Sequence, residues 1–166
     1  MISVSHPNEL VVEPFTRADL RLLFPLMAMA EPSLDLKHWL AYATPLARRR
    51  DGRAGVLVAR RNVRRFPCGA VCYHVVHDLR LGPVLTAEHF IALDLVDPHA
   101  VLMALAAQLD SLARQLGCTA VRAMVQGNAL CVDLRRTGLD NDGVVLIKQL
   151  AALGTAQKTE YAQLPR

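Results

Sequence analysis

Aromatic residues and lysines are scarce in this chain of 166 residues. Phenylalanine, tyrosine and tryptophan make up only 5% of it, whereas proteins that bind single-stranded nucleic acid stack the bases on aromatic side chains. The lysines are Lys37, Lys148 and Lys158, so the formal net charge of +4 comes almost wholly from arginine. The scarcity of aromatic residues disfavours a function that depends on base stacking.

Half of the arginines fall in one stretch, and they are Arg48, Arg49, Arg50, Arg53, Arg60, Arg61, Arg64 and Arg65. Such a cluster can contact nucleic acid or a phosphorylated ligand. A solvated helix end followed by a basic loop gives the same pattern, and we favour this interpretation because charge runs are usually solvated surface. Nucleic acid is therefore not an expected partner.

Long apolar runs are also missing from the sequence. No run reaches the roughly 18 residues that a membrane-spanning helix needs. Residues 1–13 show no basic segment followed by an apolar core, so we expect no secretory signal. These features predict a cytoplasmic protein without a membrane partner.

The four cysteines, at positions 68, 72, 118 and 131, are spread along the chain. This spacing predicts reduced thiols and not a disulfide framework. Cys68, Cys72, His74 and His77 invite a metal-site hypothesis, but the Cys-x-x-Cys spacing of structural zinc sites is absent. Alternation along a strand would also point His77 away from Cys72 and His74. We therefore expect no metal site.

The composition predicts one folded domain. Hydrophobic residues make up 52% of the chain, which argues against disorder. A chain of this length can bury a substantial core. We expect a single domain over residues 1–153, followed by a loose tail over residues 154–166 that has no apolar period.

An apolar strand that runs into a helix carries the strongest pattern in the chain. Phe90–Val96 is apolar on both faces apart from Asp94, which predicts a central strand covered on both sides. The helix that follows has one apolar stripe, formed by Leu102, Leu105, Leu109, Leu112 and Leu116. Asp97 is a good N-cap, Pro98 suits the first helical position, and Gly117 can end the helix in a left-handed conformation.

Weaker patterns supply the remaining elements. Together with the strand that starts near Glu88, we expect strands at Glu9–Phe15, Ala54–Arg60, Gly69–Val76, Thr119–Val125 and Val144–Leu150. We expect a helix capped by Thr16 and interrupted at Pro25, a second at Leu34–Arg49 and a short one at Asn128–Thr137. Leu81–Pro83 is a predicted turn before the central strand. The order is β-α-α-β-β-β-α-β-α-β.

In this order and in several short motifs, the chain resembles the GNAT acyltransferase superfamily, the acetyl-CoA-dependent N-acetyltransferases. The matching features are Gly69 at the start of the third strand, Leu95–Pro98 before the long helix, Ala113–Cys118 at its end and Leu134–Leu139 near the C-terminus. The resemblance covers roughly residues 11–150 in layout. It implies an α/β (α+β) fold with a mixed, mostly antiparallel sheet flanked by helices on both faces.

The resemblance also implies a cofactor, acetyl-CoA, beside the start of the long helix. The cofactor-binding residues expected on this basis are Leu95, Val96, His99, Leu102, Met103, Ala104 and Asn128. The family's pyrophosphate loop reads Arg/Gln-x-x-Gly-x-Gly/Ala, whereas this chain has Leu102 where the first glycine is expected. Asp97 adds a negative charge there, and as an N-cap it would accept amide hydrogen bonds that a phosphate needs.

A second departure concerns the general acid. Many members of the family have a tyrosine four residues before the late glycine, where it protonates the departing thiolate. Counted back from Gly138, this position is Leu134, which has no proton to give. Water or the ligand itself would have to replace the tyrosine.

Glu88 and Asp94 are the candidate general bases. Alternation along a single strand would point both side chains to the same face. The resemblance places the family's glutamate near Glu88, although Phe90 aligns about as well. In the alternative interpretation, Glu88 is a solvated strand end and Asp94 is a buried carboxylate paired with an arginine.

The resemblance therefore implies an acyl-CoA-dependent N-acyltransferase that passes an acetyl group directly to an unidentified amine, on a small molecule or a peptide. The alternative is a catalytically inactive GNAT-fold module that serves in binding or assembly. A third hypothesis, a nucleic-acid binder that uses Arg48–Arg65, is disfavoured by the few aromatic residues. The sequence leaves a homodimer open.

Overall fold

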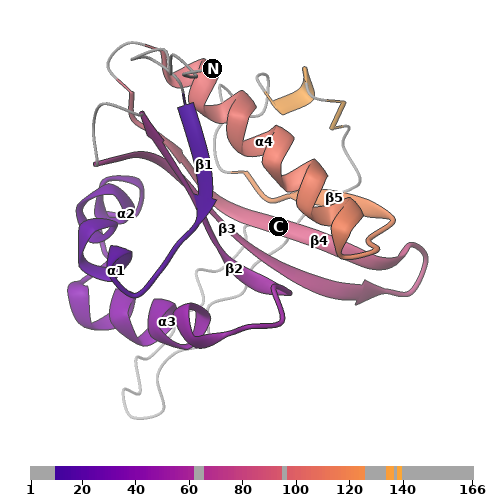
Figure 1. The fold of residues 1–166 in the computed structure, drawn as a ribbon, viewed down its shortest axis with the longest axis horizontal. Coiled ribbons are helices and arrows are strands. Elements are labelled where there is room, and N and C mark those ends of the chain that lie inside the picture. The colour runs from indigo at the N-terminus through magenta and orange to yellow at the C-terminus, as the bar shows by residue number, and fades with distance from the viewer. Residues whose placement is uncertain (1–9, 62–65, 95–96, 126–133, 137, 140–166) are drawn as a thin grey trace, which may run out of the picture.

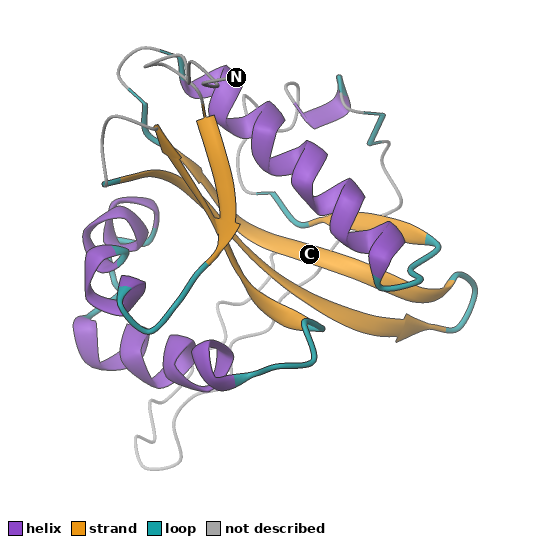
Figure 2. Ribbon diagram, in the orientation of Figure 1, coloured by secondary structure: helices purple, strands orange, loops and turns teal. Residues whose placement is uncertain are grey.

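A five-stranded sheet with the strand order β1-β2-β3-β4-β5 forms the frame of the fold (Figures 1 and 2). The computed structural model describes residues 10–61, 66–94, 97–125, 134–136 and 138–139. The strands are β1 (Leu10–Pro14), β2 (Ala54–Arg61), β3 (Pro67–Asp78), β4 (Gly82–Ala92) and β5 (Ala120–Ala123). Strands β1 to β4 pair with one another antiparallel, whereas β5 runs parallel to β4. The predicted mixed, mostly antiparallel sheet is confirmed.

Helices lie on both faces of the sheet, as the sequence predicts. They are α1 (Asp19–Leu22), α2 (Phe24–Ala30), α3 (Leu36–Arg48) and α4 (Pro98–Gln115). The first three cover one face, which we call the α3 face, and α4 crosses the other, which we call the α4 face (Figure 2). Within the described ranges, no helix is both long and apolar enough to cross a membrane.

Each face of the sheet has its own apolar core. The α4-face core combines alternate strand residues with one stripe of α4, and its members include Leu57, Val71, Leu85, Leu105 and Leu109. The α3-face core combines the intervening strand residues with the N-terminal helices, and its members include Val56, Val58, Cys72, Leu23 and Trp39. Because strand side chains alternate between faces, β2 and β3 are buried on both sides, which explains their nearly continuous apolar sequences.

Helix α4 begins and ends as the sequence predicts. Asp97 is its N-cap, and its carboxylate accepts a hydrogen bond from the Ala100 N–H at 2.9 Å. Pro98 occupies the first helical position, where a missing N–H leaves no intrahelical bond unmade. Beyond the last helical residue, Gln115, Gly117 has φ +70°, a left-handed conformation that glycine adopts without strain.

Strand β4 begins and ends earlier than predicted. The predicted turn at Leu81–Pro83 lies at the start of β4, where Asp78 already pairs with Gly82 to close the β3–β4 hairpin. The strand then ends at Ala92, so the prediction that it continues through Asp94 is wrong. The apolar pattern of the sequence could not show that Asp94 turns towards an arginine on a distant strand.

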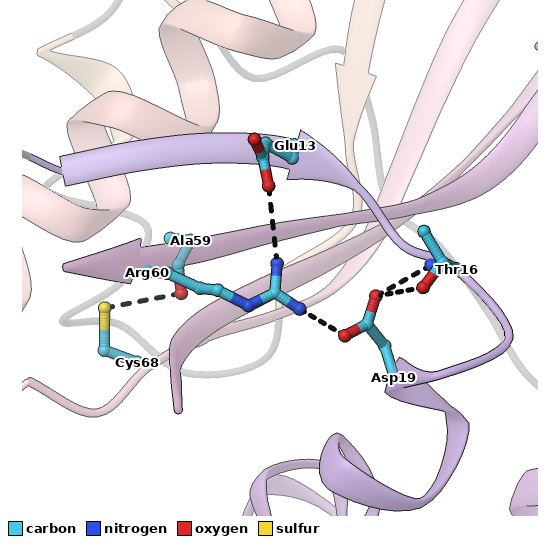
Figure 3. A network of polar contacts seen from close by, with 6 residues as sticks. All are labelled: Glu13, Thr16, Asp19, Ala59, Arg60 and Cys68. Atoms are coloured by element: carbon cyan, nitrogen blue, oxygen red, sulfur yellow. Dashed lines mark hydrogen bonds and ion pairs between the residues drawn. The ribbon is translucent and has the colours of Figure 1, made fainter. Parts of the chain in front are cut away.

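Two arginines of the basic cluster lie on β2, and both pair with acidic side chains. Arg60 on β2 contacts Asp19, and its Nη1 atom lies 3.9 Å from Oε2 of Glu13 (Figure 3). Asp19 also accepts hydrogen bonds from the N–H and the hydroxyl of Thr16, at 2.8 and 3.0 Å, which fixes the turn into α1. The side chains of Arg60 and Arg61 are only 18% and 13% exposed. The prediction that the whole cluster is solvated surface is therefore wrong for these two, because both belong to a sheet strand.

The N-terminal helices follow the predicted layout. The expected interruption at Pro25 is the junction of α1 and α2, with the proline in the first turn of α2. Helix α3 is capped by the Asp35 side chain, which accepts from the His38 N–H at 2.7 Å, and it continues past Pro45. Three predicted features lie wholly or mostly outside the described residues: the helix at 128–137, the strand at 144–150 and the tail at 154–166.

Candidate active site

A β-bulge interrupts strand β4 at its centre. In the pairing with β3, Cys72 faces Glu88 and Ala70 faces Ile91, so β4 has one more residue than β3 between these pairs. His89 lies in this interval with φ +54°, a left-handed conformation that few residues other than glycine adopt. Such bulges change the direction of side chains and are common beside active sites.

The bulge places Glu88 and Phe90 on opposite faces of the sheet. Phe90 belongs to the α4-face core, whereas Cys72, the partner of Glu88, belongs to the α3-face core. The prediction that Glu88 and Asp94 share one face is therefore wrong. The extra residue at the bulge shifts the alternation between them, and Asp94 lies beyond the end of the strand.

Strand β5 pairs with only the first part of β4. The parallel pairing runs from Val84 with Ala120 to Ala87 with Ala123, and the Met124 N–H donates to the Ala87 carbonyl at 2.8 Å. Beyond this point, none of the described strands pairs with that edge of β4. Within the part of the chain that the structure describes, the backbone of residues 88–92 is therefore an edge that an extended ligand can contact through hydrogen bonds.

Glu88 follows the last β4–β5 pair directly, and its carboxylate has polar neighbours from two other elements. Its Oε1 atom lies 3.7 Å from Nδ1 of His74 on β3. Their side chains are 26% and 40% exposed, so solvent or a ligand can reach both. The Tyr42 phenol of α3 is also close, since the negative charge of Glu88 contributes to its raised pKa.

Tyr42 extends from α3 towards the bulge of β4. Its ring meets the His89 ring edge-on, with centroids 6.5 Å apart, and it also contacts Trp39. Burial raises the pKa of Tyr42, and Cys72 adds to this effect. Burial also raises the pKa of Cys72 to about 12, against a hydrogen bond from Tyr42 that lowers it. Both groups are therefore neutral near pH 7, and they are uncharged neighbours of Glu88.

Asp94 lies in a different environment from Glu88. Its carboxylate is 2.5 Å from Nε of Arg61, and the two side chains are 6% and 13% exposed. Cys68 lies near Asp94. Burial raises the pKa of the Cys68 thiol, and the negative charge of Asp94 raises it further. This is the Arg-paired arrangement that the sequence offered as the alternative to catalysis by Asp94.

The expected cofactor-binding residues at the start of α4 differ in exposure. His99, Met103 and Ala104 are half-buried, and Leu102 is 2% exposed in the α4-face core. A ligand could therefore contact Leu102 only through its backbone. Leu95, Val96 and Asn128 lie outside the described residues, and their roles stay predictions.

Sequence reasoning missed two features beside Glu88, namely Tyr42 and the bulge. Tyr42 is three residues after the buried Trp39 on the same helix, so helical spacing could have brought it to the same side of α3.

Leu134, which stands where the family has its tyrosine, is 2% exposed in the α4-face core. Among the described residues, Cys68, Cys72 and Cys118 are free thiols, and no three His, Cys, Asp or Glu side chains are grouped to hold a metal.

Solved structures of known proteins share this fold, although no family model and no curated protein matches the sequence. Aminoglycoside N-acetyltransferase AAC(6')-Iy in complex with CoA has a TM-score of 0.75 and 14% identity over 90% of this chain and 99% of that one. AAC(6')-Ih from Acinetobacter baumannii has a TM-score of 0.70 and 15% identity, over 87% of this chain and 100% of that one. Glucosamine-6-phosphate N-acetyltransferase from Arabidopsis thaliana has a TM-score of 0.66 and 12% identity, over 86% of this chain and 99% of that one. At these identities the similarity shows a shared fold.

Proposed function

Because this chain has the fold of the GNAT acetyltransferases, we propose that it is an acyl-CoA-dependent N-acyltransferase that passes an acetyl group directly to an amine. The observation that carries the proposal is the position of Glu88. It sits at the β4 bulge, immediately after the last β4–β5 pair, with a carboxylate that solvent can reach. A carboxylate beside an open strand edge can act as a base towards a ligand bound along that edge.

The residues present fit the acyl-pantetheine arm of acetyl-CoA. The arm contains amide groups, and the backbone of residues 88–92 offers the N–H and C=O groups that such amides bind. When bound, acetyl-CoA supplies a thioester, which is an activated form of the acetyl group. His99, Met103 and Ala104 would lie beside the nucleotide part.

The start of α4 offers few amides to a diphosphate. Pro98 has no N–H, the Ala100 N–H donates to the Asp97 carboxylate, and the Val101 N–H donates to the Asp97 carbonyl at 3.4 Å. We therefore expect acetyl-CoA to be held mainly by its arm, with a smaller contribution from the phosphates than a free helix N-terminus would give.

In the proposed reaction, Glu88 accepts the proton that the amine loses as its nitrogen bonds to the acyl carbon. The Tyr42 ring and the His89 ring border the side of the sheet from which the amine would approach. Leu134 cannot supply a proton, so water would protonate the departing thiolate.

The acceptor is an amine on a small molecule or a peptide. The neighbours named for aminoglycosides and glucosamine-6-phosphate support this class.

Thermal unfolding with acetyl-CoA and with free CoA tests the proposal. At a ligand concentration one hundred times Kd, binding at one site adds about 2.7 kcal/mol to the free energy of unfolding. We expect such stabilisation in the native protein and in Glu88→Gln, and acetyl transfer to amines only in the native protein. Absence of stabilisation by any acyl-CoA at millimolar concentration would overturn the proposal and leave the inactive binding module.

A further inference from the structure

We infer that His74 receives the proton from Glu88 and carries it to solvent, so that the two residues form a proton relay on the α3 face. This inference rests on the proposed function, because it assigns a path to the proton that the amine loses. The relay residue comes from β3, and nothing in the sequence pattern around it indicates catalysis.

The register of β3 and β4 places the two side chains side by side. Cys72 faces Glu88 and His74 faces Thr86, so His74 and Glu88 are diagonal neighbours on adjacent strands. Diagonal neighbours on one face lie within reach of long side chains. Here the Nδ1 atom of His74 and the Oε1 atom of Glu88 are 3.7 Å apart, a distance that one small side-chain rotation or a bridging water closes.

The His74 side chain is more exposed to solvent than the Glu88 side chain, so the proton would move from Glu88 to His74 and then to solvent. The Glu88 side chain is 26% exposed and the His74 side chain is 40% exposed. A histidine ring can accept a proton at one nitrogen and release another from the second nitrogen. The more exposed residue is therefore suited to deliver the proton to water.

The buried hydroxyl of Thr86 adds a polar group beside His74 and Glu88. Thr86 is 4% exposed, and its Oγ1 atom has no hydrogen-bond partner among the residues that the structure describes. Thr86 lies two residues before Glu88 and directly across from His74, so its side chain is on the same face. A buried hydroxyl requires a partner, which a water or the acceptor molecule can supply at this point.

The proposed steps balance in atoms and charge. An N–H bond of the amine breaks as an O–H bond forms on the Glu88 carboxylate, while the nitrogen bonds to the acyl carbon. The bond between that carbon and the thioester sulfur breaks, and water protonates the departing thiolate. The O–H bond then breaks as an N–H bond forms at Nδ1 of His74, which restores the carboxylate. The imidazolium finally releases its Nε2 proton to water.

Several other ionisable groups surround the relay and contribute to its pH dependence. They are Tyr42 from α3, Cys72 from β3, His89 from β4, and Arg122 from β5 with its partner Asp78. Tyr42 and Cys72 keep their protons near pH 7, because burial raises the pKa of each. These two groups therefore contribute no change of charge near that pH.

Two measurements test the relay, and His77 provides a matched control. His77 is on the same strand, is exposed, and by alternation faces away from His74. The first measurement is the pH profile of kcat/KM for thiol release from acetyl-CoA with n-butylamine as the probe amine. We expect His74→Asn to lower kcat/KM about tenfold and to change the profile between pH 5 and 8, whereas His77→Asn leaves both unchanged.

The second measurement needs no turnover and no variant of His74. The ring signals of His74 and His77 are followed by NMR as a function of pH in the native protein and in Glu88→Gln. We expect the ring signals of His74 to change in Glu88→Gln, because its Nδ1 atom lies 3.7 Å from the Glu88 carboxylate, and the ring signals of His77 to be the same in both proteins.

The results separate failure of the relay from failure of the proposed function. If His74→Asn matches the native protein in rate and pH profile, or if the ring signals of His74 are the same in Glu88→Gln, the relay is wrong while acyl transfer stands. If the native protein neither binds acetyl-CoA nor releases thiol, the proposed function fails and the relay fails with it.

Discussion

The Asp94 carboxylate lies 2.5 Å from the Nε atom of Arg61, a residue 33 positions earlier in the chain. Arg61 ends β2, whereas Asp94 follows the end of β4, so the pair joins these two strands across β3. With side chains 13% and 6% exposed, the two residues form a buried ion pair. The pair holds the chain shortly before α4 begins.

Breaking this pair should destabilise the protein. We expect Asp94→Asn to lower the free energy of unfolding by about 3 kcal/mol, because it removes the negative charge that the largely buried guanidinium of Arg61 contacts. Urea unfolding of the native protein and the variant measures the change. The double variant Arg61→Met with Asp94→Leu should recover much of the loss, since it buries no charge. A loss below about 0.5 kcal/mol in the single variant would show that the pair behaves as a surface ion pair.

Removing the charge of Asp97 should strengthen CoA binding. Asparagine is as good an N-cap as aspartate, so Asp97→Asn keeps α4 in place while it removes an anion from the helix start. We expect CoA to bind about threefold more tightly, as measured by titration calorimetry. Pantetheine, which has no phosphate, should bind equally to both proteins, and Asp110→Asn further along α4 serves as the control variant. An equal gain for pantetheine would contradict an electrostatic cause.

Gly69 lets α4 approach strand β3, and a larger residue should disturb this contact. A Cβ atom at this position would lie 2.3 Å from Cγ1 of Val101 and 2.9 Å from the carbonyl oxygen of Ile91. We expect Gly69→Ala to lower the free energy of unfolding by about 2 kcal/mol in urea unfolding. The double variant with Val101→Ala should recover only part of the loss, because the backbone carbonyl remains. Full stability in the single variant would show that the helix can shift freely.

The acid stability of the protein should depend on Asp78. A hydrogen bond from Arg122, followed by those from the Arg80 and Leu81 N–H groups, lowers the pKa of Asp78 to about 2. An aspartate in an unfolded chain titrates near pH 3.9, so the stabilisation is complete above about pH 4 and is lost as the pH falls towards 2.

Asp78→Asn should remove this dependence, and Arg122→Gln should reduce it, because the hydrogen bonds from the Arg80 and Leu81 N–H groups remain. We expect each variant to lose less stability than the native protein between pH 4 and 2, as measured by urea unfolding at a series of pH values. Parallel curves for the three proteins would show that the Asp78–Arg122 contact contributes nothing in solution.

The features that the sequence predicts well are those set by local chemistry. The N-cap Asp97, the first-turn Pro98 and the terminal Gly117 define α4, and all three act within a few residues of their positions. Burial of the central strand on both faces likewise follows from its apolar content, since Phe90 lies in the α4-face core and Ile91 in the α3-face core. These signals were enough to predict the order of elements as far as β5.

The geometry of the candidate site depends on contacts between distant residues, which a single sequence does not contain. The bulge at His89 arises from the register of β4 against β3, and it overturns the prediction that Glu88 and Asp94 share a face. The approach of Tyr42 to the bulge depends on how α3 packs on the sheet. The partner of Asp94 likewise became evident only in the folded chain.

Transfer of a labelled acetyl group from acetyl-CoA to a set of primary amines, compared between the native protein and Glu88→Gln, tests the central claim most directly. The account predicts a labelled amide product with the native protein and a rate at least about one hundredfold lower with Glu88→Gln, although both proteins bind acetyl-CoA equally. Equal rates in the two proteins would contradict the role of Glu88. A native protein that does not bind acetyl-CoA would contradict the account as a whole.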